Sequence, residues 1–598
     1  MLFKGWTPRD TLYFALIGIG EILIFFRNPG HFFIADTVLW MGYRHRSLGD
    51  FFGAFISADP ALWYRPLSQR TVESLLYPLA GLQPISYHVA MFVLYFTCTI
   101  AVFLFTEQLT GSRRAAWIAT LIFAPHVTHA FTTYDTAFVP EMMFALFFVG
   151  SAIAWVSWLR SGNRRMLVVS AVLFVGSLLS KETAVALPFT LFAIWLFLPV
   201  EKRGRLRSLA PHFVILLVYL VFAIGYVHIR SIDIGQLVEN PGTAGQKGYQ
   251  LVLGKNVWDS AGVAFSWAFG LARRIGQWSV AAPWMVSMLK AVRALIMVLA
   301  LFVMFTPRRN YVVIGLAWFL LTAAPTLPLL DHFVPYYLFA PLVGFSIAVG
   351  VVLDWAYERS AMYSRPLAFA FCATLLGSLA YIHASAADSA MRTHPLLGIS
   401  AENAESGMKD MLALHPSLPK GATLVIFDEE NPNLYLDQAR GMLYSMAYKD
   451  DSVTTMYFSS GISVSKDDLK TGKTFVFKSS GGQMTDITSF VIQRPDLLSP
   501  HNPNDRLRLE LSKSEVDAIN DTYVMHVSEL KDSQDRRFNV LRAYNGIVED
   551  PFQVTLDDHG QFEFKLDHKT KAGTYTYVAL QRLGDSNWVT VSGSVRVQ

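Results

Sequence analysis

The feature that most constrains this chain is a series of apolar runs of 16 to 24 residues, which recur from the N-terminus to about residue 384. About 20 apolar residues span a hydrocarbon core of about 30 Å. The 598-residue chain is 53% hydrophobic, and beyond residue 384 it reads as an ordinary soluble protein. The sequence therefore predicts a polytopic α-helical membrane protein with a C-terminal soluble domain. Its net charge of +4 is too small to indicate nucleic-acid binding.

The stretch 165–199 decides how the apolar runs are counted. As one helix it would be about 52 Å long, and Lys181 and Glu182 would lie near the midplane at a cost of several kcal/mol. Two crossings with a turn at Lys181-Glu182 instead place the flanking basic clusters, Arg164-Arg165 and Lys202-Arg203, on the same side of the membrane. The positive-inside rule makes that side the cytoplasm.

The same reasoning predicts eleven crossing helices, with the N-terminus in the cytoplasm and the C-terminal domain outside. The segments assigned to the cytoplasm hold fifteen Lys and Arg residues against four acids. Residues 257–280 are ambiguous between a further crossing and an amphipathic segment on the outer surface, and we favour the surface. The expected helices span residues 11–26, 85–108, 115–131, 136–158, 165–180, 183–199, 209–229, 283–305, 311–329, 334–353 and 366–384.

Carboxylates, cations and aromatic side chains collect in the segments assigned to the outer face. A carrier of polar cargo would be expected to place ionisable residues near mid-bilayer, but the predicted membrane centres are nearly free of them. This pattern favours chemistry at the membrane–water boundary on a substrate with a lipid tail. The first outer loop, 27–84, carries Asp36, Arg44, Tyr64, Arg65, Arg70 and Glu73, and the later outer turns carry Asp135, Glu141, Lys181, Glu182, Asp331, His332, Tyr336 and Tyr337.

Such a site suits transfer of a group from a lipid phosphate to a hydroxyl. This reaction needs a carboxylate to accept the proton of the acceptor, and cations to stabilise charge on the leaving phosphate. Asp36, about ten residues beyond the first helix, is the candidate base. Arg44, Arg65 and Lys181 are the candidate phosphate ligands.

Each candidate also has a structural interpretation. Asp36 suits a cap or turn, and Lys181-Glu182 suits an interfacial turn that keeps a helical hairpin hydrated. Asp331-His332 suits a cap for the following helix, and His88 suits an interfacial histidine better than a ligand. No spacing typical of metal ligands, phosphate loops or nucleophile elbows occurs, so the sequence does not indicate a metal.

Three stretches carry a family resemblance: "WYRPLSQRTVESLLYPLAGLQPISYHVAMFVLY" (63–95), "LTGSRRAAWIATLIFAPHVTHA" (109–130) and "GSLLSKETAVALP" (176–188). Together they resemble the C-type (GT-C) membrane glycosyltransferase superfamily, in its protein O-mannosyltransferase-like branch. In that branch a YRPL segment, a G-L-x-P-x-x-Y-H segment, a short T-G-S-x-x-A loop and a K-E pair occur in this order.

The resemblance implies a GT-C fold with an outward cavity under the first outer loop. It implies a sugar donor carried on a polyprenyl phosphate, and transfer with inversion to a glycan, lipid or protein acceptor. Asp36 then corresponds to the acidic base of the family, Arg65 to its YRPL arginine, and Lys181 and Glu182 to its lysine–glutamate pair. Many relatives have two adjacent acids in the first loop, whereas Thr37 follows Asp36 here.

The C-terminal region reads as soluble modules with recurrent β-type runs. Residues 385–420 are expected to form a linker with a helix at 400–414, residues 421–500 a small α/β or β unit, and residues 501–598 an immunoglobulin-like β-sandwich. Docking of envelope-assembly partners is one role for 421–598.

Two other functions stay open at this stage. One is a non-catalytic or transport component of envelope polysaccharide assembly, and the other is an oligosaccharide ligase or polymerase with a pyrophosphate-linked donor. In each case the chain is expected in the plasma membrane.

Overall fold

The structure is a computed structural model of the 598-residue chain. It divides into two compact units, with the boundary between Ile399 and Ser400. The residues that it describes are 6–56, 64–199, 206–229, 251–272, 283–329, 332–427, 434–457, 471–480, 483–489, 508–511, 515–516, 522–528, 537–544, 547–548, 552–557, 561–565, 573–583 and 587–597.

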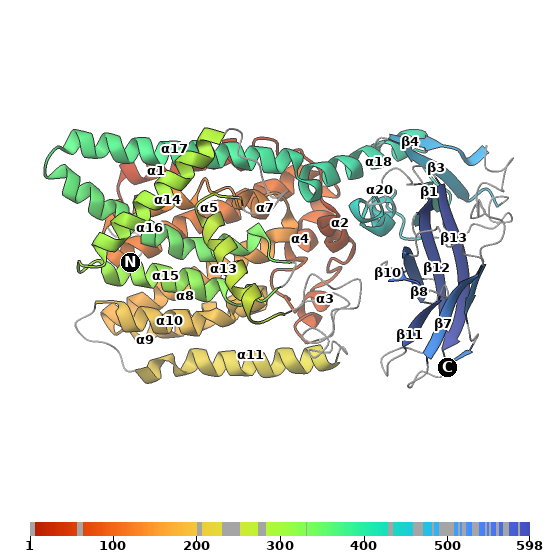
Figure 1. Cartoon of the computed structure of the whole chain (residues 1–598), viewed down its shortest axis with the longest axis horizontal. Helices are drawn as coiled ribbons and strands as arrows, with labels where there is room; N and C mark the ends of the chain where they lie inside the picture. Colours follow the sequence, from red (N-terminus) through yellow and green to blue (C-terminus); the bar gives the residue numbers. More distant parts are fainter. Residues whose placement is uncertain are drawn as a thin grey trace. The chain divides into compact units, whose positions relative to one another are not determined.

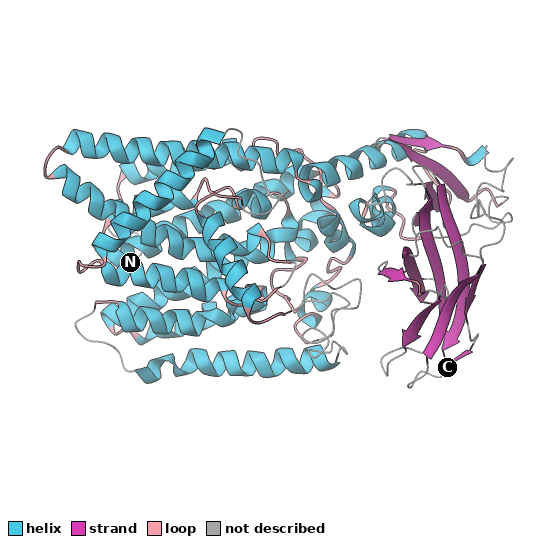
Figure 2. Ribbon diagram, viewed as in Figure 1, coloured by secondary structure: helices cyan, strands magenta, loops and turns pink. Residues whose placement is uncertain are grey.

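The first unit is built of helices that run alongside one another as a bundle (Figures 1 and 2). Short 3-10 segments are labelled η, and η6 is a π-helical turn. The elements are α1 (Pro8–Phe25), α2 (Ala35–Gly42), α3 (Leu48–Gly53), α4 (Thr71–Ala80), α5 (Pro84–Thr110), α6 (Arg113–Phe123), α7 (His129–Thr133), η1 (Thr136–Phe138), α8 (Val139–Ser161), α9 (Arg164–Ser180), η2 (Glu182–Ala186), α10 (Leu187–Phe197), η3 (Leu206–Leu209), α11 (Ala210–Ile229), α13 (Lys255–Ala268), α14 (Pro283–Val303), α15 (Arg309–Ala323), η5 (Pro335–Leu338), α16 (Phe339–Ala361), α17 (Arg365–Thr393) and η6 (Pro395–Ile399).

Most expected helices lie where the apolar runs placed them, and α9 and α10 form the predicted hairpin with its turn at Lys181-Glu182. Within the described residues, five helical stretches are long and apolar enough to span a membrane: Pro84–Thr110, Thr136–Ser161, Pro283–Val303, Pro335–Ala361 and Arg365–Leu414. Three of them combine neighbouring elements: η1 with α8, η5 with α16, and α17 with η6 and the helix Ser400–Leu414. The total of eleven crossings stays a prediction. Helix α13 has 14 residues, about 21 Å, which is shorter than the hydrocarbon core.

The prediction of one helix over 115–131 is wrong. Helix α6 ends at Phe123, and α7 begins only at His129. Pro125 lies in this interval, and a proline has no backbone N–H with which to continue the hydrogen bonds of a helix. Three further bounds differ, because α15 ends at Ala323, α16 continues to Ala361, and α17 continues to Thr393 through an alanine-rich stretch within the expected linker.

Glycines set the closest helix contacts of the bundle. A Cβ atom on Gly344 of α16 would overlap the carbonyl oxygen of Gly315 on α15, so these two backbones approach each other directly. On the other side of α16, a Cβ atom on Gly350 would lie 2.9 Å from the carbonyl oxygen of Ala115 on α6. Small residues permit such packing in lipid, where no hydrophobic force draws helices together.

Ion pairs join the segments that the sequence assigns to the cytoplasm. Asp10 bonds Arg113, and the buried Asp354 on α16 bonds both Arg114 and Arg308. Glu358 contacts the same two arginines. Segments expected on one side therefore lie together at one end of the bundle.

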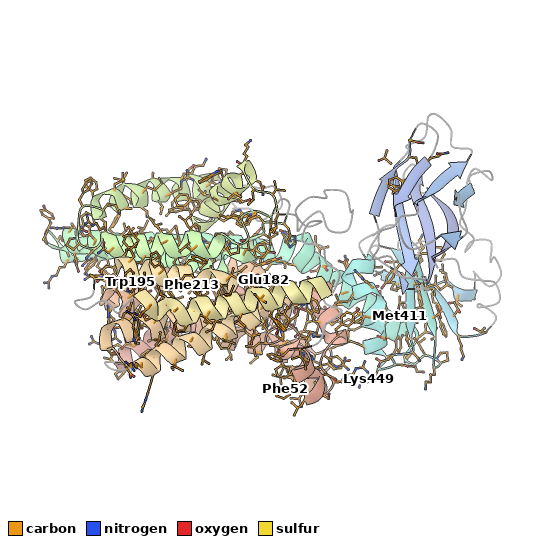
Figure 3. All side chains as sticks on the ribbon, turned by 90° about the horizontal axis from the view of Figure 1, so that it is seen from below. Phe52, Glu182, Trp195, Phe213, Met411 and Lys449 are labelled. Atoms are coloured by element: carbon orange, nitrogen blue, oxygen red, sulfur yellow. The ribbon has the colours of Figure 1, made fainter. Side chains whose placement is uncertain are left out.

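In the second unit, a four-stranded sheet in the order β2-β1-β3-β4 packs with short helices. Strand β1 pairs in parallel with both β2 and β3. Met411 of α18, labelled in Figure 3, belongs to one buried cluster with Leu424 and Ile426 of β1. The elements are α18 (Ser400–Leu414), β1 (Thr423–Phe427), α19 (Leu434–Asp437), η7 (Ala439–Gly441), α20 (Met442–Ala447), β2 (Thr454–Tyr457), β3 (Thr474–Ser480) and β4 (Gln483–Asp486).

The last described strands form two further sheets, in the orders β10-β8-β12-β13-β6 and β11-β7-β5, with β9 paired to β8. All of their pairs are antiparallel except β13 with β6. The strands are β5 (Arg508–Leu511), β6 (Glu515–Val516), β7 (Thr522–Ser528), β8 (Arg537–Tyr544), β9 (Ile547–Val548), β10 (Phe552–Thr555), β11 (Gln561–Lys565), β12 (Gly573–Leu583) and β13 (Asn587–Val597). The immunoglobulin-like sandwich stays a prediction.

Candidate active site

A polar cavity of about 240 Å³ is lined in part by residues of α2 and α4. These two helices lie at one end of the bundle (Figure 1). The cavity contains five of the residues selected from the sequence, namely Asp36, Arg65, Glu141, Lys181 and Tyr336. Its walls are formed by Asp36, Leu39, Trp40, Arg65, Ser68, Gln69, Arg70, Glu73, Thr136, Ala137, Phe138, Pro140, Glu141, Lys181, Tyr336 and Tyr337.

Asp36 stands in the first turn of α2 and is exposed. The N-terminal end of a helix favours a negative charge. Helix α2 begins after Ile34, whose backbone N–H donates a 2.7 Å hydrogen bond to the carboxylate of Asp135. Asp135 thus fixes the backbone two residues before Asp36.

Asp135 itself is fully buried and does not line the cavity. Besides Ile34, it accepts a 2.6 Å hydrogen bond from the N–H of Thr136. Burial raises the pKa of Asp135 to about 7, although both backbone hydrogen bonds favour the charged form. Asp135 therefore supports the backbone of the loop and does not face the cavity.

Arg65 is held against the tip of the α9–α10 hairpin. Its Nε and one terminal nitrogen donate 2.8 Å and 2.6 Å hydrogen bonds to the two carboxylate oxygens of Glu182. Burial alone would lower the pKa of Arg65, but Glu182 raises it above its usual value. The neighbouring chain is tied to the same tip, because the N–H of Leu67 donates to the carbonyl oxygen of Leu179 at 3.1 Å.

Lys181 and Glu182 do not pair with each other. Lys181 ends α9 with an extended backbone (φ −162°, ψ 140°), and successive side chains of extended chain point to opposite sides. Lys181 therefore bonds Glu141 of α8, whereas Glu182 bonds Arg65. Glu182 and Trp195 lie near opposite ends of the second arm of the hairpin, which consists of η2 and α10 (Figure 3).

The interpretation of this tip as a hydrated turn is wrong for Lys181, which is only 1% exposed. Its Nζ lies 4.6 Å from the ring centre of Tyr337 and 5.8 Å from that of Tyr336. Two aromatic rings and one carboxylate thus hold the ammonium group at the cavity wall. Their attraction opposes burial and the charge of Arg65, which lower the pKa of Lys181 well below its ordinary value.

Glu73 and Arg70 also line the cavity; both were expected in the first outer loop, but neither was given a role in the site. Glu73 is 1% exposed and lies in the first turn of α4, which follows Arg70. Arg70 has left-handed backbone (φ 67°), an uncommon state for a residue other than glycine, and it donates a 3.1 Å hydrogen bond to the carbonyl oxygen of Tyr43. A lone acid in the apolar stretch "TVESLLYPLAG" is the signal that points to Glu73.

The other selected residues lie outside the cavity wall. The Tyr64 hydroxyl donates to the carbonyl oxygen of Phe55 at 3.0 Å, and the Arg44 guanidinium lies 3.9 Å from the ring centre of Tyr77. Both ring nitrogens of His88 contact backbone carbonyls, those of Pro29 and Tyr134. His332 contacts the Tyr336 hydroxyl at 3.1 Å, and Asp331 lies outside the described residues.

The cavity wall thus combines cations with carboxyl groups. Arg65, Arg70 and Lys181 supply positive charge for an anionic ligand, while Asp36 and Glu73 supply carboxyl groups to accept or donate protons. Within the described residues, no group of three or more His, Cys, Asp or Glu side chains is arranged to hold a metal ion.

Fold and site together define a multi-helical protein, with helices apolar enough to span a membrane and one polar cavity that combines acids and bases. Residues 71–227 match the family model described as dolichyl-phosphate-mannose-protein mannosyltransferase. The match includes α4 and the α9–α10 hairpin, and it confirms the resemblance to the protein O-mannosyltransferase-like branch of the C-type glycosyltransferases. A comparison with curated proteins found no match.

Two solved structures are similar to this chain at low identity. A crystal structure of ArnT from Cupriavidus metallidurans, bound to undecaprenyl phosphate, is 13% identical and has a TM-score of 0.47, covering 83% of this chain and 95% of that one. The oligosaccharyltransferase AglB from Archaeoglobus fulgidus, in complex with an inhibitory peptide and a dolichol-phosphate, is 11% identical. Its TM-score is 0.40, and the match covers 97% of each chain.

Proposed function

We propose that this protein is a membrane glycosyltransferase, which transfers a sugar from a polyprenyl-phosphate-linked donor to a hydroxyl group of an acceptor. The observation that carries the proposal is the cavity in which Asp36 shares a wall with Arg65 and Lys181. The family match adds support, since its description names a polyprenyl-type phosphate sugar as donor and a protein as acceptor.

Each residue has a part in the proposed transfer. Asp36 accepts the proton of the acceptor hydroxyl as its oxygen bonds the anomeric carbon of the sugar. The bond from that carbon to the phosphate oxygen breaks, and the electron pair leaves with the lipid phosphate. Arg65 and Lys181 stabilise the negative charge that develops there. Attack opposite to the leaving phosphate inverts the anomeric configuration.

Glu141 and Glu182 are positioning residues in this scheme. Each forms an ion pair with one of the two phosphate-binding cations. A cation held by a buried carboxylate keeps its charge and its orientation before the donor arrives, which lowers the reorganisation needed in the transition state.

We place the cavity on the outer face of the plasma membrane. The ion pairs of Asp354 with Arg114 and Arg308 join the basic segments assigned to the cytoplasm. The cavity is formed by segments assigned to the opposite side. The C-terminal unit then lies outside the cell membrane, where docking of an acceptor or of an envelope-assembly partner is its proposed role.

The size of the cavity favours a single sugar over an oligosaccharide. Its volume of about 240 Å³ is below the range of about 300–1,000 Å³ that is typical of pockets for drug-sized ligands. A ligase with a long pyrophosphate-linked glycan would need more room around the anomeric carbon.

Mass spectrometry of envelope glycans, lipids and proteins tests the proposal. Cells that lack the gene should lose one sugar from one class of acceptor. The wild-type gene should restore that sugar, and a gene for Asp36→Asn should not. An envelope that is unchanged in the deletion strain would contradict the proposed function.

A further inference from the structure

Glu73 is a buried acid of the cavity wall that the mechanism above does not use. Its side chain is 1% exposed, and it lies on α4, a helix too short to span the membrane. Glu141, the other buried acid in the wall, forms an ion pair with Lys181.

One oxygen of Glu73 has no hydrogen-bond partner among the described residues. This atom is Oε1, which is buried, while the Thr136 side chain hydrogen-bonds the carboxyl group. Buried polar atoms in folded proteins nearly always have a partner, so an acid that lines a cavity and has an oxygen without one indicates a place for a ligand.

The charges around Glu73 limit what that ligand can be. Burial raises the pKa of Glu73 to about 7, and the charge of Arg70 opposes this rise. The carboxyl group therefore exists both with and without its proton near neutral pH. It can donate as well as accept a hydrogen bond, which matches a sugar hydroxyl, whereas its ionised form would repel a phosphate.

We propose that Glu73 binds the sugar of the donor, by a hydrogen bond between its carboxyl group and a hydroxyl of the transferred monosaccharide. The inference rests on the proposed function. The cavity then has two subsites, with Arg65 and Lys181 on the phosphate and Glu73 on the sugar. The substrate class is a polyprenyl-phosphate monosaccharide with a free hydroxyl at the position that Glu73 contacts.

Binding of lipids with and without a sugar separates the two subsites. The full-length protein in nanodiscs is titrated with undecaprenyl phosphate and with its mannose, glucose and galactose derivatives. Wild-type protein should bind at least one sugar derivative more tightly than the sugar-free lipid. Glu73→Ala should lose about tenfold in affinity for that derivative, equivalent to about 1.4 kcal/mol, and stay within about twofold for undecaprenyl phosphate.

Glu73→Gln is the matched control, because an amide keeps the shape and both hydrogen-bonding functions. Glu73→Gln should retain most of the affinity that the sugar adds over undecaprenyl phosphate alone. Equal losses for both lipids in Glu73→Ala, or no loss for either, would overturn the inference, as would a wild-type protein that gains nothing from any of the three sugars. Wild-type protein that binds none of the lipids would instead contradict the proposed donor class.

Discussion

The carboxylate of Asp135 accepts a 2.7 Å hydrogen bond from the backbone N–H of Ile34, a residue 101 positions earlier in the chain. This contact joins the loop before α8 to the start of α2, where Asp36 stands. The proposed base is therefore positioned by a buried acid of a different segment, and the role of Asp135 can be tested separately from that of Asp36.

Asp135→Ala should weaken the start of α2. It removes the acceptor of two backbone N–H groups, and buried donors without a partner cost about 1–3 kcal/mol each. We expect a lower melting temperature in detergent and a turnover reduced at least about tenfold. Asp135→Asn keeps one acceptor oxygen, so its melting temperature and turnover should lie between those of wild type and those of Asp135→Ala. Wild-type melting temperature and turnover in Asp135→Ala would show that the contact does not matter.

Lys181→Met should lower stability, because it leaves Glu141 buried without its cation. Breaking a buried pair on one side costs about 3–5 kcal/mol. The double variant Lys181→Met/Glu141→Gln removes both charges, so it should recover most of the melting temperature. Both variants should bind undecaprenyl phosphate about tenfold more weakly than wild type. Wild-type affinity in the double variant would return the pair to a purely structural role.

Glu73 should make the folded protein less stable as the pH rises. Its folded pKa of about 7 lies above the ordinary 4.5, because burial disfavours the ionised form. Between these values the folded state keeps a proton that the unfolded chain releases, so stability falls from about pH 4.5 to about pH 7 and is then level. The shift corresponds to at most about 3 kcal/mol.

Glu73→Gln cannot ionise and should flatten this decline. Melting temperatures of both proteins between pH 4.5 and pH 8.5 test the prediction. Asp135, whose pKa is also raised, will leave a residual decline in the variant. Parallel pH profiles for the two proteins would show that Glu73 is already ionised in the folded state at low pH.

Asp354→Asn provides a control at the opposite end of the bundle. Asp354 is 1% exposed and contacts Arg114, Arg308 and the hydroxyl of Ser112. Removing its charge should lower the melting temperature, since it leaves two arginines without a buried partner. Affinity for undecaprenyl phosphate should stay within about twofold of wild type. A large loss of lipid affinity would link the two ends and weaken the assignment of a local site.

The helices could be predicted because hydrophobicity along the chain fixes them. Helix α9 runs from Arg164 to Ser180 where 165–180 was expected, and α18 matches 400–414. Hydrophobicity does not predict where a helix is interrupted, so the break around Pro125 was missed. Nor does it predict how far a helix continues past its apolar stretch, as α17 does from the expected end at residue 384 to Thr393.

Part of the site could be predicted and part could not. The family motifs indicated Arg65 and the Lys181-Glu182 pair, and the structure brings both to one tip. Adjacency in sequence suggested that Lys181 and Glu182 form one polar turn, but the extended backbone at Lys181 directs their side chains to different partners. Glu73 was expected in the first outer loop, but its place in the site was not predicted, because burial of a single acid on a short helix depends on tertiary packing.

The most direct test of the proposed function is to separate donor binding from transfer in Asp36→Asn. This variant keeps the shape of the side chain but cannot accept the acceptor's proton. With the donor that wild type prefers, we expect donor affinity within about twofold of wild type and a kcat for sugar transfer reduced about 10²- to 10⁴-fold. Transfer at the wild-type rate by Asp36→Asn would contradict the role of Asp36 as the base.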